Sequence, residues 1–163
     1  MTTNFPKGHR IMKFSAKSTT IDKQKTPCAV IFASGKTLLP SAQTIDKSLG
    51  GTLSHLVKNE DLKTSAGNSL WIALNPEQSS VCQRLMIVQL GSTAKNTKQV
   101  FSQTNLRKAF NQISAKLKAK GLKEACIFVD DITVEESNNK DALTWIGETL
   151  AKSTLHTLSL IHI

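Results

Sequence analysis

The sequence contains no tyrosine, and aromatic residues make up only 5% of its 163 residues, so its core must be mainly aliphatic. Long apolar runs are also missing. The longest one, Cys28 to Ala33, is far shorter than the roughly 20 residues that a membrane-spanning helix needs. The first ten residues, "MTTNFPKGHR", hold no apolar segment of the kind found in secretory signals. We therefore expect a cytoplasmic protein that makes no contact with a membrane.

Cysteine and histidine are too few and too scattered to predict a metal or redox site. Cys28, Cys82 and Cys126 form no C-x-x-C pair, and Cys28 and Cys126 lie in apolar runs where cysteine acts as a small hydrophobic residue. No histidine shares a helical face with another histidine or cysteine, and no G-x-S-x-G motif occurs. We expect this chain to hold no cofactor, no metal ion and no hydrolase triad.

Acidic residues are absent from a long central stretch. None lies between Glu77 and Glu124, whereas nine lysines and arginines lie from Arg84 to Lys123. The segment from Glu124 to Glu148 then carries seven acids and one base. The net charge of +9 is thus unevenly distributed, which makes a polyanion or an acidic protein a candidate partner.

Strand-like and helix-like segments alternate along the chain. Apolar runs predict buried strands at 28–34, 69–74, 84–90 and 124–130, and an alternating segment from Met12 predicts one more. Helical signals begin at Pro40, are interrupted at Gly50-Gly51, and recur over 106–120 and 141–156. The loop between the strands 69–74 and 84–90 predicts a hairpin or a short excursion. This order is typical of an α/β protein whose sheet is covered on both faces.

The last two helices have clear apolar faces. The first is expected to begin at a cap formed by Thr104 or Asn105 and to end at Gly121. Its predicted buried residues are Leu106, Ala109, Phe110, Ile113 and Leu117. The predicted buried residues of the second are Leu143, Trp145, Ile146 and Leu150.

Two segments have some of the features of phosphate-binding loops. Gly91 follows the strand 84–90, but such loops need several glycines at fixed spacing or a Gly-Lys-Ser/Thr at a helix start. Gly35-Lys36-Thr37 is similar to the end of one, yet Val30 stands where its first glycine is required. We interpret Gly91 as the point where a buried strand turns into a polar loop.

Asp130 and Asp131 end a predicted strand, where open α/β sheets often bind ligands. Paired carboxylates can hold a divalent ion or act as acid and base. Only Glu135-Glu136 lies nearby as a second acidic cluster, and no histidine is tied to the pair by spacing. We favour solvated loop acids.

The basic helix offers candidate contacts for a polyanion. Its bases surround the polar side instead of lining one stripe, and no aromatic residues are interleaved with them, as stacking on single-stranded nucleic acid would require. Both features favour a solvated face; weak binding of nucleic acid would fall steeply with salt. The candidate contacts are Arg107, Lys108, Lys116, Lys118, Lys120 and Lys123.

Four stretches of the chain follow one another in a distinctive order. They are "MKFSAKS" with "CAVIFAS", "DKSLGGTLSHLVKNEDLKTSAGNSLWIAL", "RLMIVQLGS" before "LRKAFNQISAKLKAKG", and "GETLAKSTLHTLSL". Together, over residues 12–160, they resemble the N-terminal domain of the cytosol (leucyl) aminopeptidase family. The resemblance implies a macro-domain-like three-layer α/β/α sandwich with a mixed, largely parallel sheet. Residues 1–11 would then form a flexible extension, and 161–163 a tail.

The same resemblance implies a role without catalysis. Members of the family are two-domain, usually hexameric aminopeptidases that release N-terminal residues with two divalent metal ions. Their metal ligands and catalytic residues lie in a C-terminal domain, including a stretch reading roughly N-T-D-A-E-G-R, which this sequence lacks. No catalytic residue therefore carries over. We expect an assembly or regulatory domain whose partners are the catalytic domain or other subunits.

The sequence departs from the family at two places, and two other functions stay open. Gln89-Leu90-Gly91 stands where the family commonly has Gly-Leu-Gly, and "GETLAK" reverses an acid and a glycine. The chain also stops at "LIHI", where the connector to the catalytic domain would begin. The first alternative is a nucleic-acid-binding module that uses the stretch from Arg84 to Lys123. The second is an ADP-ribose-type binder that uses the loops after Ser34 and Gly91.

Overall fold

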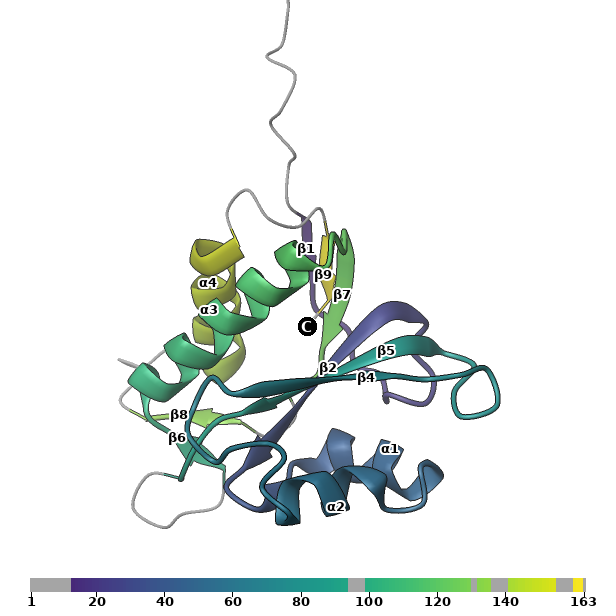
Figure 1. Ribbon diagram of the computed structural model, residues 1–163. Coiled ribbons are helices and arrows are strands. Elements are labelled where there is room, and N and C mark those ends of the chain that lie inside the picture. Colours follow the sequence, from purple (N-terminus) through teal and green to yellow (C-terminus); the bar gives the residue numbers. More distant parts are fainter. Residues whose placement is uncertain (1–12, 94–98, 130–131, 136–140, 155–159, 163) are drawn as a thin grey trace, which may run out of the picture.

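The computed structural model describes residues 13–93, 99–129, 132–135, 141–154 and 160–162 (Figure 1). The predicted extension over residues 1–11 and the acidic pair Asp130-Asp131 lie outside these ranges. Within them, no helix is long and apolar enough to cross a membrane.

Seven strands form one twisted sheet in the order β1-β9-β7-β2-β5-β4, with β3 paired to β2. Neighbouring strands are parallel except in the pairs β4–β5 and β2–β3, so the predicted mixed, largely parallel sheet is confirmed. The antiparallel β4–β5 pair is the predicted hairpin. The strands are β1 (Lys13–Ser15), β2 (Thr26–Ser34), β3 (Thr37–Leu38), β4 (Ser69–Ala73), β5 (Cys82–Gln89), β7 (Glu124–Ile127) and β9 (Leu160–His162).

Helices cover both faces of this sheet, which confirms the three-layer α/β/α sandwich. In Figure 1, α1 (Pro40–Ser48) and α2 (Thr52–Lys58) lie against one face, and α3 (Gln103–Ala119) and α4 (Ala142–Thr154) against the other. A small parallel sheet of β6 (Val100–Phe101) and β8 (Thr133–Val134) lies beside α3 and α4.

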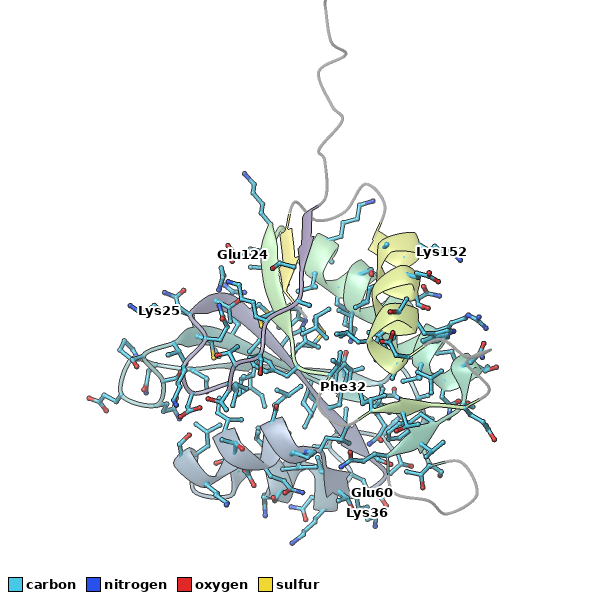
Figure 2. All side chains as sticks on the ribbon, turned by 180° about the vertical axis from the view of Figure 1, so that it is seen from behind. Lys25, Phe32, Lys36, Glu60, Glu124 and Lys152 are labelled. Carbon is cyan, nitrogen blue, oxygen red and sulfur yellow. The ribbon has the colours of Figure 1, made fainter. Side chains whose placement is uncertain are left out.

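The central strand β2 explains why both layers of helices are needed. Successive side chains of a strand point to opposite faces. Cys28, Val30 and Phe32 therefore pack under α3 and α4, whereas Ala29, Ile31 and Ala33 pack under α1 and α2. All six are almost fully buried. Phe32 meets Phe110 of α3 edge to face, with ring centroids 6.3 Å apart, and Figure 2 shows Phe32 in the middle of the packed side chains.

Three predictions about single elements are wrong. The segment 69–74 is not a buried strand, because β4 is one of the two edge strands of the sheet and most of its residues are only half-buried. Leu143 is 45% exposed, since it lies in the first turn of α4 beside an open cavity. α3 starts earlier than expected, because Ser102 caps it by accepting a hydrogen bond from the amide of Asn105 at 3.2 Å. The predicted end at Gly121 is confirmed by the helix stopping at Ala119.

The short helix α2 takes its N-terminal cap from the preceding helix. Its own N-cap residue is Gly51, which has no side chain to offer. The carboxylate of Asp46, buried near the end of α1, instead accepts hydrogen bonds from the amides of Leu53 and Ser54, at 2.7 and 3.3 Å, and from the Ser54 hydroxyl. This carboxylate satisfies amides that a helix N-terminus otherwise leaves without partners.

Replacing Asp46 with alanine is therefore expected to lower the free energy of unfolding by about 2 kcal/mol, because the buried amide of Leu53 and the half-buried amide of Ser54 lose their acceptor. Urea denaturation followed by circular dichroism measures this loss. Asp61→Ala, at an exposed acid just beyond α2, is the matched control and should change stability little. Equal losses in the two variants would contradict the capping role.

Candidate functional site

The carboxyl ends of β2 and β5 form the first candidate site, because parallel sheets commonly bind ligands there. The loop after β2 begins at Ser34-Gly35, and the loop after β5 begins at Leu90-Gly91. The two loops touch directly. The hydroxyl of Ser34 donates to the carbonyl of Gly91 at 2.8 Å, and the amide of Leu90 donates to the carbonyl of Ala33 at 2.8 Å.

The fully buried side chain of Gln89 occupies the space between these loops. Its Oε1 accepts hydrogen bonds from the amides of Gly35 and Gly91, at 2.7 and 3.2 Å. Its Nε2 donates to the carbonyl of Gly35 at 2.8 Å. Its backbone is also paired, with the carbonyl of Asn68 and the amide of Gly67. One side chain thus joins the ends of the two central strands.

This arrangement uses the groups that a phosphate would need. Anions bind in such loops through backbone N–H groups that point into an open space. Here the amides of Gly35 and Gly91 already donate to Gln89. Gln89 stands where the family commonly has a glycine. Its partner Gly91 is two residues away, but its partner Gly35 is 54 residues away in the chain and could not be identified from local sequence.

Gly91 has the role predicted for it. It follows β5 with a φ of +77°, a conformation that favours glycine, and a Cβ there would lie 3.0 Å from Nδ2 of Asn105. Glycine thus lets the strand turn while α3 packs close to it.

The six predicted polyanion contacts do not form one patch. Lys108 and Lys116 line a polar cavity of about 500 Å³ beside residues 66–69, and Lys120 lies over the ring of Trp71 at 5.5 Å. Arg107 lies instead over Trp145 at 5.4 Å and donates to Gln103 at 3.1 Å. Lys118 is exposed, and Lys123 lies in the turn before β7. Lys108, Lys116 and Lys120 therefore lie on the β4 side of α3, and Arg107 lies on its α4 side.

The three thiols are buried in the core, as predicted. Burial raises the pKa of Cys28 and Cys126 to about 12, and it also raises the pKa of Cys82. Such thiols stay protonated at neutral pH and are poor nucleophiles. Among the residues that the structure describes, no three of His, Cys, Asp and Glu come together as a metal-ligand set.

A comparison with protein-family models identifies the fold's relatives. The model described as "Cytosol aminopeptidase family, N-terminal domain" matches residues 29–156. This chain belongs to the cytosol aminopeptidase family. A probable cytosol aminopeptidase of Saccharophagus degradans is 29% identical over 149 residues, which cover 91% of this chain and 28% of that protein. The chain therefore spans little more than a quarter of this relative's length and corresponds to the N-terminal domain.

Solved structures agree with this assignment of the fold. A tomato leucine aminopeptidase mutant superposes with a TM-score of 0.66 at 16% identity, over 98% of this chain and 33% of that one. The macrodomain of Mycobacterium tuberculosis DarG also gives 0.66, at 6% identity, over 93% of this chain and 97% of that one. The cytosol aminopeptidase N-terminal domain described here thus has a macrodomain-like fold, as the sequence predicted.

Gln89→Ala is expected to destabilise this domain by about 3 kcal/mol, because the buried amide of Gly91 and the half-buried amide and carbonyl of Gly35 lose the partner that joins β2 to β5. Gln83→Ala is the control, since Gln83 is an exposed glutamine on the same strand. Chemical denaturation of both variants measures the difference. A loss no greater than that of the control would mean that Gln89 does not hold the loops together.

Proposed function

We propose that this chain is the non-catalytic domain of a cytoplasmic aminopeptidase-like protein, in which it serves assembly or regulation. The observation that carries the proposal is the family match over residues 29–156, in a chain that spans about a quarter of its relative's length. The catalytic domain of that protein would then release N-terminal residues with two divalent metal ions. The catalytic domain and other subunits would be its partners.

The chemistry of the described residues supports the absence of catalysis in this domain. General acid–base and nucleophilic catalysis require titratable groups within hydrogen-bond reach of each other and of a substrate. The buried carboxylate of Asp46 is instead committed to the cap of α2, and the three thiols are protonated core residues. The described donor groups do not fit a two-metal centre, so we assign no catalytic step to this chain.

The purified chain is expected to give no hydrolysis of leucine p-nitroanilide above the blank when Mn²⁺ or Zn²⁺ is added. A full-length cytosol aminopeptidase in the same buffer is the positive control. Metal-dependent turnover that copurifies with the chain would refute the non-catalytic role.

The assembly role needs a separate comparison. In a chimera, this chain replaces the N-terminal domain of the Saccharophagus degradans protein, and a second variant lacks that domain altogether. We expect the chimera to keep the oligomer size of the natural protein in light scattering, and the truncated variant to lose it. If the truncated variant assembles and works like the natural protein, the domain does not serve assembly.

The ADP-ribose alternative is less well supported, because Gln89 already occupies the amides of the two loops. We expect isothermal titration calorimetry to detect no heat when ADP-ribose is added to the chain. A saturable heat that Gln89→Ala alters would instead identify the carboxyl ends of β2 and β5 as a nucleotide site.

A further inference from the structure

The strand β4 leaves one edge of the main sheet open. It is the last strand in the sheet order and pairs only with β5. The carbonyl of Asn68 and the amide of Leu74 bond to β5, so even-numbered residues direct their backbone groups toward that strand. The amides and carbonyls of Ser69, Trp71 and Ala73 therefore point outward, and no described residue pairs with them. This row of groups can accept another strand.

The edge lacks the usual features that prevent such pairing. Natural proteins protect an edge strand with charged residues, proline or a bulge. β4 has the sequence Ser-Leu-Trp-Ile-Ala, without a charge or a proline, and it pairs with β5 in an unbroken register. Leu70, Trp71 and Ile72 are half-buried, so an added strand would cover apolar surface as well.

One flank of α3 lines this edge with positive charge. Lys108 and Lys116 lie at residues 66–69, and Lys120 lies over Trp71 further along β4. α3 and β4 thus run in the same direction. The three lysines are eight and four residues apart in the sequence and therefore share one side of the helix. Arg84 of β5 lies with Trp71 and Lys120 around a second cavity of about 960 Å³. Among the residues that line the two cavities, Glu124 is the only acid.

An unsatisfied polar group also lies in this region. In the part of the chain that the structure describes, the buried hydroxyl of Ser69 has no hydrogen-bond partner. Ser69 lines the cavity together with Asn111, Gln112 and the two lysines. Hydroxyl, amide and ammonium groups all donate hydrogen bonds, so a carboxylate is a fitting occupant.

We propose that the β4 edge binds an extended acidic segment of a protein partner, which adds to the sheet as the next strand. Its backbone would pair with Ser69, Trp71 and Ala73. Alternate side chains of a strand lie about 7 Å apart on one face, and lysines four residues apart on a helix lie about 6 Å apart along its axis. Acids at alternate positions can therefore meet Lys108, Lys116 and Lys120. A second copy of this chain fits less well, because two rows of lysines would face each other.

The test uses the full chain and a fluorescein-labelled peptide of alternating glutamate and threonine, with fluorescence anisotropy as the readout. We expect saturable binding that Lys116→Glu weakens by at least about tenfold, through repulsion of the nearest carboxylates. Lys118→Glu is the matched control. It changes the same residue type on the same helix, but Lys118 lines neither cavity. The Lys118→Glu variant should lose much less of its affinity for the peptide.

A second variant separates strand addition from simple charge attraction. Ala73→Pro removes an outward-pointing amide but none of the bonds to β5, and proline is tolerated at such positions of edge strands. The side chain of Ala73 is exposed, so the variant should keep its circular dichroism spectrum and thermal midpoint. We expect the peptide to bind it at least about tenfold more weakly.

Several results would overturn the proposal. They are no saturable binding, equal effects of Lys116→Glu and Lys118→Glu, and binding that a folded Ala73→Pro variant leaves unchanged. Tighter binding of duplex DNA than of the peptide, insensitive to Ala73→Pro, would assign the same lysines to nucleic acid instead. These results do not depend on whether the chain is catalytic.

Discussion

The burial of β2 and β5 on both faces is the constraint on which the rest of this domain depends. Apolar side chains that alternate to opposite sides must be covered on both, and the two helical layers provide that cover. Both faces of the sheet are consequently filled with side chains. The strand ends and the edge strands of the sheet remain accessible to a ligand or partner.

The strand ends and the β4 edge differ in how their backbone groups are used. At the carboxyl ends of β2 and β5, Gln89 engages the amides of both following loops, so the polar groups are satisfied within the domain. At β4 the outward amides and carbonyls have no partner among the described residues. A macrodomain-like fold fixes the position of such sites and not their chemistry.

Features that depend on near neighbours in the sequence could be predicted, whereas features that depend on distant partners could not. The apolar run of β2, the break at Gly50-Gly51 and the buried face of α3 follow from local periodicity, and the resemblance to a family added the layer architecture. The side-chain hydrogen bonds of Gln89 reach Gly35, 54 residues away in the sequence. The placing of Lys120 and Arg107 on different sides of α3 depends on Trp71 and Trp145, which belong to other elements. The prediction that Leu143 is buried is wrong because helical periodicity does not reveal where the neighbouring layer ends.

The cap that Asp46 supplies to α2 has a consequence for how this side of the domain comes apart. A helix of seven residues is too short to persist in water without outside support. Because that support is a carboxylate carried by α1, fraying of α1 at Asp46 would release α2 at the same time. The two helices should therefore open and close together as one cooperative segment, even though a pair of glycines divides them in the sequence.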